Sequence, residues 1–171
     1  VEKVAEVTQN GKVGVLGTPG TVASLSYPIE LEKWSEGKVV STVQEACPLW
    51  VPLVENYELD SPGTEYFVGK NINALLAKDP EIDTIVLGCT HYPLLMPVIR
   101  KYIPPRVRLI NQGEVVAEKL EDYLKRHPEI RTKISADGRI RYLTTENSAL
   151  FESKAGLFLD ETVTAETVVL K

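Results

Sequence analysis

The stretch from Asp83 to Leu95, DTIVLGCTHYPLL, decides how this chain is organised. Its β-branched and apolar beginning predicts a buried strand over residues 84–87. A glycine then leads into small and reactive side chains, and an apolar helical pattern follows. Between the expected strand and the expected helix lie Cys89, Thr90 and His91. Because ligands of open α/β sheets bind at the carboxyl ends of the strands, this segment is the expected chemical centre.

The rest of the chain alternates between strand patterns and helix patterns. Strands are expected over residues 12–17, 39–43, 107–110, 140–143 and 163–170. Helices are expected from Thr21 to about Trp34, over 65–78, over 114–125 with the apolar side chains on an inner face, and from a cap at Asn147 to about Leu159. This alternation predicts an α/β fold with a parallel sheet flanked by helices.

Composition narrows the classes of function. The 171 residues carry 19 basic and 24 acidic side chains, a formal charge of −5, so nucleic acid is not an expected partner. With 43% hydrophobic residues a globular core is expected, and no apolar run reaches the length of a membrane span. No signal segment is expected, and the two cysteines lie far apart outside any C-x-x-C pattern. A reducing compartment, the cytoplasm, is therefore expected.

Polar and reactive side chains follow three of the expected strands. They are Thr18 and Thr21, then Cys47 with Glu55, then Cys89, Thr90 and His91. If the strands are parallel neighbours, these groups lie at one edge of the sheet. Threonine hydroxyls and backbone N–H groups suit a metabolite with a carboxylate, and a thiolate can act as nucleophile or base. His91 is within reach of Cys89 only around a turn, where it can donate a proton or polarise a substrate carboxylate.

Each of these residues also has a purely structural interpretation. Cys89 could be a small buried hydrophobe, His91 a helix cap, Thr18 and Thr21 turn and cap residues, and Glu55 a solvent-facing side chain. Cys47 lies among apolar neighbours and is expected in the core. A zinc site is poorly supported, because the other histidine belongs to a different element and structural zinc takes four ligands. The glycines at 17 and 20 do not form a dinucleotide-binding pattern.

Four segments together resemble the glutamate racemase family. The segment from Leu87 to Leu95 is similar to the second cysteine motif of these bacterial enzymes. In the right order around it lie a threonine turn (Gly17 to Val22, with Ser24 and Tyr27), an apolar loop ending in glutamate (Ala46 to Glu55), and a closing strand and helix (Tyr142 to Thr145, with Phe151 and Phe158). The cysteine-threonine-histidine motif alone is shared with the wider aspartate and glutamate racemases.

The resemblance implies a cofactor-independent amino-acid racemase. Such enzymes interconvert L- and D-glutamate with one cysteine on each face of Cα, and the D-glutamate enters peptidoglycan. By position, Cys89 would take the proton from L-glutamate, with His91 and Glu55 in supporting parts. Substrate carboxylate would be held by Thr18, Thr21 and Thr90. Cys47 has no catalytic counterpart.

The chain also departs from the family pattern. An Asp-Ser turn and a Cys-Asn-Thr segment with the other catalytic cysteine have no match in these 171 residues. On the two-domain plan of the family, residues 1–112 would be the second domain and 113–171 the returning part of the first. Roughly the first third of the enzyme would then be absent, and the chain alone is expected to be inactive in racemisation, because one face lacks its acid. Asn111-Gln112 stands where an Asp-Ser pair is expected, and a homodimer is a further expectation.

Other functions stay open at this stage. The chain could belong to a racemase for aspartate or hydantoins, or it could be a non-catalytic module that binds carboxylates. A cysteine hydrolase using Cys89 and His91 is less favoured, because no third residue to orient the histidine is evident from the sequence.

Overall fold

The structure is a computed structural model that describes residues 1–135 and 137–170. The chain divides into two compact units, Val1–Leu120 and Glu121–Lys171. The expected assignment of residues 1–112 and 113–171 to two domains stays a prediction.

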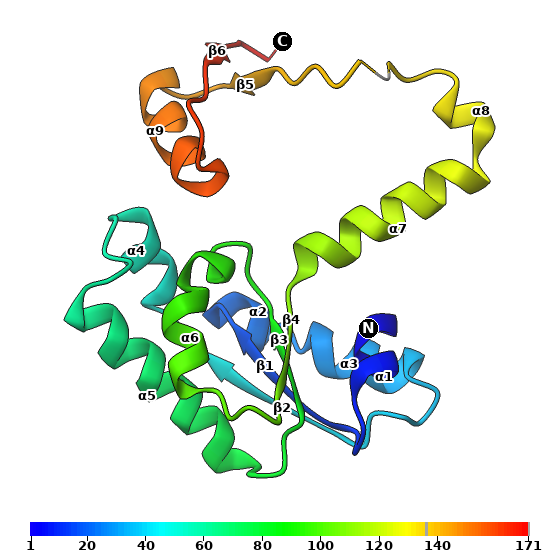
Figure 1. The fold of residues 1–171 in the computed structure, drawn as a ribbon, viewed down its shortest axis with the longest axis vertical. Helices are drawn as coiled ribbons and strands as arrows, with labels where there is room; N and C mark the ends of the chain where they lie inside the picture. Colours follow the sequence, from blue (N-terminus) through cyan, green and yellow to red (C-terminus); the bar gives the residue numbers. More distant parts are fainter. Residues whose placement is uncertain (136, 171) are drawn as a thin grey trace. The chain divides into compact units, whose positions relative to one another are not determined.

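The first unit contains a four-stranded sheet whose strands all run parallel (Figure 1). The strands are β1 (Lys12–Gly17), β2 (Ser41–Ala46), β3 (Thr84–Leu87) and β4 (Arg108–Ile110), and their order in the sheet is β2-β1-β3-β4. The predicted α/β fold with a parallel sheet is therefore confirmed.

Helices cover both faces of this sheet (Figure 1). Their bounds are α1 Glu2–Val7, α2 Pro19–Ala23, α3 Ser26–Trp34, α4 Trp50–Glu55, α5 Pro62–Lys78, the 3₁₀ helix η1 Tyr92–Leu95 and α6 Met96–Tyr102. A further helix, α7 (Gln112–Arg126), begins after β4 and continues beyond Leu120, the last residue of this unit. Side chains from α1 and α3 pack against alternate residues of β1, including Val13 and Val15. The intervening Gly14 lies against Leu75 of α5.

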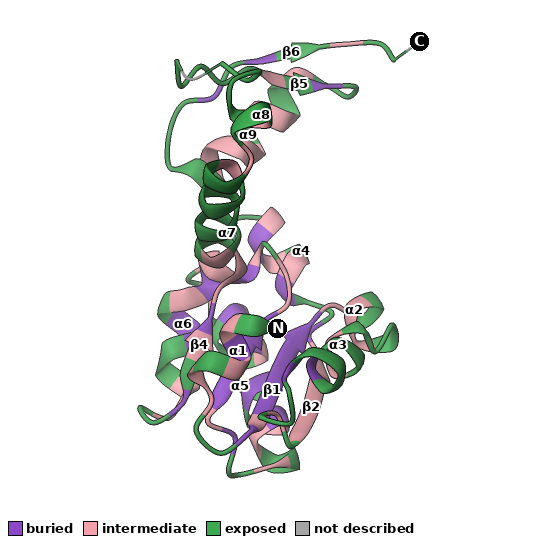
Figure 2. Ribbon diagram, turned by 90° about the vertical axis from the view of Figure 1, so that its right-hand side faces the viewer, coloured by how far each residue is buried: buried purple, intermediate pink, exposed green. Residues whose placement is uncertain are grey.

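Burial on both faces explains the apolar character of the central strands. Figure 2 shows β1 as buried along most of its length, and all four residues of β3 are buried. Strands buried on both sides form near-continuous apolar runs, because neither face meets water. This is why these two strands were evident from the sequence.

In the first unit, one expected helix and one expected strand depart clearly from the sequence-based prediction. The helix expected from Thr21 to Trp34 is two helices, because Leu25 adopts a left-handed backbone conformation (φ 54°) between them. Thr18, and not Thr21, caps the first of these, since its Oγ1 accepts the N–H of Thr21 at 3.2 Å. The second strand begins at Ser41 and ends at Ala46, later than the expected range 39–43.

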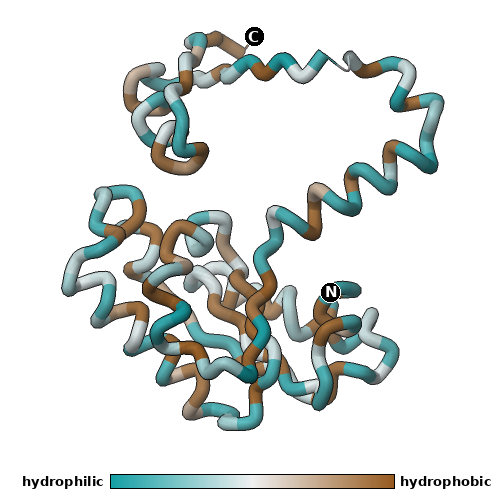
Figure 3. The backbone as a smooth tube through the Cα atoms, in the orientation of Figure 1, coloured by the Kyte–Doolittle hydropathy of each residue, from teal (hydrophilic) through white to brown (hydrophobic). Residues whose placement is uncertain are grey.

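The apolar side of α7 agrees with the prediction only in part. Hydrophobic segments recur along this helix (Figure 3), and these side chains were expected on an inner face. Val115 packs against the core of the first unit as expected, whereas Val116 and Leu120 are 62% and 55% exposed. Helical periodicity shows which side chains share a stripe but not whether another element covers it.

The second unit contains a small parallel pair of strands, β5 (Tyr142–Thr144) and β6 (Ala165–Thr167). Its helices are the short α8 (Pro128–Arg131), absent from the sequence-based prediction, and α9 (Ser148–Leu159). Asn147 caps α9 as predicted, its side chain accepting the N–H of Leu150 at 3.1 Å. Among the described residues, no helix is both long and apolar enough to cross a lipid bilayer.

Candidate active site

The candidate site lies at the topological switch point of the sheet. The chain passes from β1 to β2 on one side of β1 and then to β3 on its other side, so the switch point lies between β1 and β3. Leu16 of β1 pairs with Leu87 of β3, which places Thr18 and Cys89 directly beyond the tips of these two neighbouring strands. Ligands of open α/β sheets bind at this position, because the loops diverge there and leave a crevice.

Cys89, His91 and Glu55 form a connected set of side chains. Cys89 Sγ lies 3.8 Å from Nδ1 of His91, and the other ring nitrogen, Nε2, lies 3.2 Å from Oε1 of Glu55. The sequence places Glu55 far from the cysteine, and the fold brings it onto the histidine. A carboxylate on one ring nitrogen orients the imidazole and stabilises its protonated form, which in turn favours a thiolate at the other nitrogen.

Exposure of these side chains suits a reactive site. The histidine side chain is 21% exposed and the glutamate side chain 38% exposed, and Cys89 is half-buried. A thiol must be both accessible and ionisable to react, and a fully buried cysteine is neither. The interpretation of Cys89 as a small buried hydrophobe is therefore wrong.

His91 does not use its side chain as a helix cap. It occupies the N-cap position of η1, yet its side chain makes no capping hydrogen bond there. The ring is held between the thiol and the carboxylate instead. The turn between strand and helix brings the ring back to a residue only two positions earlier in the chain.

A buried aromatic pair packs the helix that carries Glu55 against the short helix that follows His91. Trp50 at the start of α4 and Tyr92 at the start of η1 are both fully buried, with ring centroids 4.7 Å apart. Trp50 Nε1 donates to Oδ1 of Asn71 on α5 at 3.1 Å. Because α4 ends at Glu55 and η1 follows His91 directly, this packing sets the distance between the carboxylate and the imidazole.

Cys47 is part of the core, as expected. Its side chain is 1% exposed, and burial, followed by the nearby Glu45 carboxylate, raises the pKa of its thiol well above the ordinary value. The hydroxyl of Tyr92 donates to the backbone carbonyl of Cys47 at 3.5 Å. A thiol that stays protonated and covered is inert toward alkylation and proton transfer.

The threonines at the tip of β1 are linked to each other. Oγ1 of Thr18 lies 2.9 Å from Oγ1 of Thr21, and Thr18 also caps α2. The cap interpretation is therefore confirmed for Thr18 and wrong for Thr21, which lies inside the helix. Capping is compatible with ligand binding, because both side chains are only half-buried. Thr90 is exposed on the turn between Cys89 and His91.

Two further residues near the site carried no predicted role. Tyr27 lies over Gly88, where an added Cβ would come within 3.2 Å of its ring, and Gln112 hydrogen-bonds to the Tyr27 hydroxyl. Tyr27 was visible as part of the threonine-turn resemblance, and Gln112 as a departure from the expected pattern. No local signal indicated that the two side chains meet.

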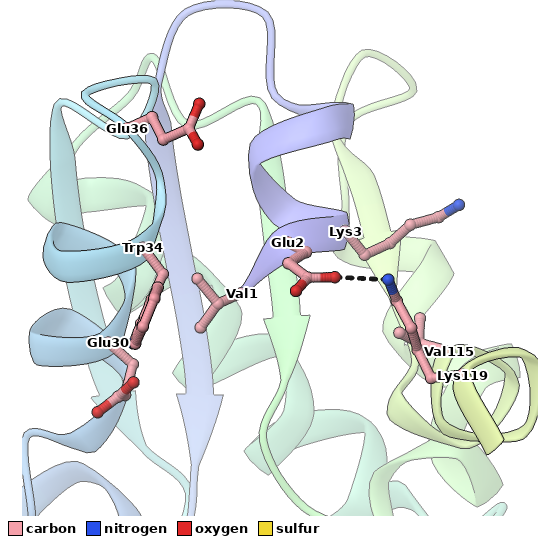
Figure 4. Close-up of a pocket in the computed structure, with 8 residues that line it drawn as sticks. All are labelled: Val1, Glu2, Lys3, Glu30, Trp34, Glu36, Val115 and Lys119. Carbon is pink, nitrogen blue, oxygen red and sulfur yellow. Dashed lines mark hydrogen bonds and ion pairs between the residues drawn. The ribbon is translucent and has the colours of Figure 1, made fainter. Parts of the chain in front are cut away.

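A separate hollow of about 700 Å³ is lined by none of these site residues (Figure 4). Trp34 lies on one side of it, and the ion pair between Glu2 and Lys119 on the other. The hollow contains neither cysteine nor histidine, so it is not the place of the thiol chemistry.

The fold and the site together define the class of protein: an open α/β domain with a cysteine–histidine–carboxylate set at the switch point of its sheet. Comparison with known proteins then shows which proteins the chain resembles. No family profile matches the chain. The chain is 36% identical over 170 residues to a glutamate racemase of Persephonella marina, covering 99% of this chain and 61% of that protein. It is 38% identical over 126 residues to a glutamate racemase of Chlorobaculum parvum, covering 74% and 45%.

A solved structure agrees with these sequence relatives. The glutamate racemase isoform RacE1 from Bacillus anthracis is 31% identical and superposes with a TM-score of 0.81, covering 99% of this chain and 62% of that protein. By sequence and by fold the chain is similar to glutamate racemases along nearly its whole length. It spans between 45% and 61% of the length of the two curated relatives.

Proposed function

We propose that this chain contributes one catalytic face of a glutamate racemase, with Cys89 as the group that moves the α-proton. The observation that carries the proposal is the contact of the thiol with His91, which is itself held by Glu55. The glutamate racemase relatives support the reaction and the substrate.

The proposed step balances without a cofactor. The thiolate of Cys89 removes the proton from Cα of L-glutamate, so that an S–H bond forms and the C–H electron pair stays on the substrate. A second acid on the opposite face then donates a proton to Cα and completes the inversion. The α-proton of an amino acid is only weakly acidic, so electrostatic support for the developing negative charge is essential.

Substrate binding is assigned to the hydroxyls at the strand tips. We propose that Thr18, Thr21 and Thr90 donate hydrogen bonds to the substrate carboxylates, next to the thiol. The register of β1 and β3 supports this assignment, because it places Thr18 and Cys89 beyond the ends of two neighbouring strands. A charged carboxylate accepts such bonds at roughly twice the strength of a neutral acceptor.

The chain alone is expected to exchange protons without inverting Cα. Its other cysteine, Cys47, is buried and has a raised pKa, so it cannot act as the second acid. We propose that the acid for the opposite face lies outside these 171 residues. One base can still remove a proton and return it to the same face.

Deuterium exchange tests this proposal. The chain is incubated with L- or D-glutamate in deuterium oxide, the α-proton is followed by NMR, and inversion is followed by circular dichroism. We expect exchange of L-glutamate that Cys89→Ser abolishes and Cys47→Ser preserves, with no inversion. Exchange that survives Cys89→Ser, or exchange absent from the unaltered chain, would contradict the proposal, and rapid inversion would contradict the need for a second acid.

A second substrate distinguishes the closest alternative. L-Aspartate is assayed beside L-glutamate, because related racemases act on it. The two substrates differ by one methylene group, so the side-chain carboxylate of glutamate lies further from Cα than that of aspartate. We expect L-glutamate to exchange faster. Faster exchange of L-aspartate would assign the chain to an aspartate racemase instead.

Hydrolysis is the function that the geometry supports next. Cys89, His91 and Glu55 form a nucleophile, a base and an orienting group, so the sequence-based expectation that the third residue is missing was wrong. The relatives favour proton transfer over acyl transfer. Release of p-nitrophenol from p-nitrophenyl acetate at a rate that depends on all three side chains would favour the hydrolase.

The biological setting follows from the proposed reaction. We propose a cytoplasmic, cofactor-independent role in supplying D-glutamate for peptidoglycan, in a protein that forms a homodimer. The racemase relatives support this setting as a family property.

A further inference from the structure

Gln112 connects two elements that flank the tip of β3. Its Nε2 donates a hydrogen bond to the hydroxyl of Tyr27 on α3 and a longer one, 3.4 Å, to the carbonyl oxygen of Leu87, the last residue of β3. Gln112 itself begins α7, directly after β4. One side-chain amide therefore joins α3, the end of β3 and the start of α7.

The ring of Tyr27 restricts the next residue of the chain. An added Cβ at Gly88 would lie 3.2 Å from Cε2 of Tyr27 and 3.0 Å from the carbonyl oxygen of Leu16. The N–H of Gly88 donates to that same carbonyl at 2.8 Å. The peptide that leads into Cys89 is thus held between the tip of β1 and the phenol ring.

The same ring is electrostatically coupled to the reactive thiol. Burial, and secondly the charge of the Cys89 thiolate, raise the pKa of the Tyr27 hydroxyl above its ordinary value. The phenol is therefore neutral at working pH. Because its oxygen accepts the bond from Gln112, its own proton remains able to donate elsewhere.

We propose that Tyr27 and Gln112 act as a pair of positioning residues for Cys89. Gln112 fixes the phenol to the end of β3, and the phenol in turn fixes the Gly88–Cys89 peptide so that the thiol meets His91. The proposal rests on the proposed role of Cys89 as the reactive thiol. Neither residue is assigned a contact with substrate.

Gln112 suits this task by its length. The sequence pattern of the family led us to expect an Asp-Ser pair at 111–112, where this chain has Asn111 and Gln112. A serine hydroxyl is attached one bond beyond Cβ and is too short to span from the start of α7 to both partners. The departure from the pattern therefore creates the link seen here.

Alkylation of the thiol tests the proposal in the chain as it is. The rate of iodoacetamide labelling at Cys89 is measured by peptide mass spectrometry across a pH series, for Tyr27→Phe, Gln112→Ser and the double variant. Tyr66→Phe, a change at an exposed tyrosine on α5, is the matched control. Buried Cys47 reports unfolding, because it labels only when the core opens.

We expect each single variant to slow labelling of Cys89 at neutral pH about threefold to tenfold and to move the pH profile upward, as losing one hydrogen bond would. The double variant is expected to lose no more than the stronger single variant, because the two side chains act as one unit. Tyr66→Phe is expected to label like the unaltered chain.

Several results would overturn the proposal. Labelling at the unaltered rate in both single variants, losses that multiply in the double variant, or a loss accompanied by labelling of Cys47 would each do so. If Cys89 of the unaltered chain reacts no faster than glutathione, the reactive-thiol role fails instead. The two failures are distinguishable because labelling does not depend on racemisation.

Discussion

Replacing Glu55 with glutamine tests the electrostatic core of the site. The change preserves the shape of the side chain and removes its charge, which lies 3.2 Å from Nε2 of His91. Two unit charges at this distance attract each other by about 1.3 kcal/mol in a water-like dielectric. Partial exposure of both side chains, 21% and 38%, limits the interaction to about 1 kcal/mol.

A loss of this size corresponds to about a fivefold change in a rate that depends on the interaction. We therefore expect Glu55→Gln to slow iodoacetamide labelling of Cys89 about fivefold at neutral pH, with little change in the free energy of unfolding. Raising the salt concentration should narrow the difference, because it screens partly exposed charges.

The matched control is Glu58→Gln, which removes one exposed carboxylate three positions along the chain. It changes the net charge of the chain equally, and we expect it to leave the labelling rate unaltered. A Glu55→Gln protein that labels within a factor of about two of the unaltered chain would refute the electrostatic reasoning. If Glu58→Gln slows labelling equally, the cause of the slowing is the net charge of the chain and not the contact of Glu55 with His91.

Three further predictions concern the framework around the site. Gly69→Ala should destabilise the fold by about 1–2 kcal/mol in urea unfolding, because the new Cβ would lie 2.6 Å from the ring of Tyr102, whereas Gly63→Ala in the same helix should not, its nearest neighbour being 3.6 Å away. Burial opposes ionisation of Asp83, but the hydrogen bonds that its carboxylate accepts outweigh this effect and lower its pKa. The ionised carboxylate therefore stabilises the folded chain above about pH 4, and this stabilisation is lost as the pH falls through the pKa of the folded state. Cys47 should resist iodoacetamide at pH 8 and react on unfolding, because burial raises the pKa of its thiol.

Each of these predictions has a result that contradicts it. Equal stability of the two glycine variants would mean that the Tyr102 ring moves aside at no cost. An Asp83→Asn protein that keeps the steep loss of stability in acid would assign that loss to other carboxylates. Rapid labelling of native Cys47 would show that the core around it opens readily.

Much of the fold was predictable because the central strands appear in the sequence as short apolar runs. β1 and β3 are apolar runs bounded by glycine and turn residues, and their burial on both faces is what produces such runs. The edge strand β2 was placed two to three residues early, since its residues are only half-buried and their pattern is weaker. The helix expected from Thr21 to Trp34 contains Pro28, a residue type that kinks or ends helices, and the break lies three residues before it, at Leu25.

The stripe on α7 shows where periodicity stops being informative. Val116 and Leu120 lie on one side of the helix, and the prediction of an inner face assumed a partner within the chain. Spacing determines which side chains share a side, but covering that side requires another element of suitable shape. The structure leaves both side chains more than half exposed.

The sequence by itself determined the alternation of strands and helices, and it placed the reactive cysteine at the end of a strand. Both depend on contacts between near neighbours along the chain, which leave a periodic pattern. Only the tertiary structure decided that Glu55 meets His91, 36 positions away, and that Gln112 meets Tyr27, 85 positions away. These pairs form because parallel strands bring their carboxyl ends to one edge, and such a meeting of distant loops leaves no local pattern.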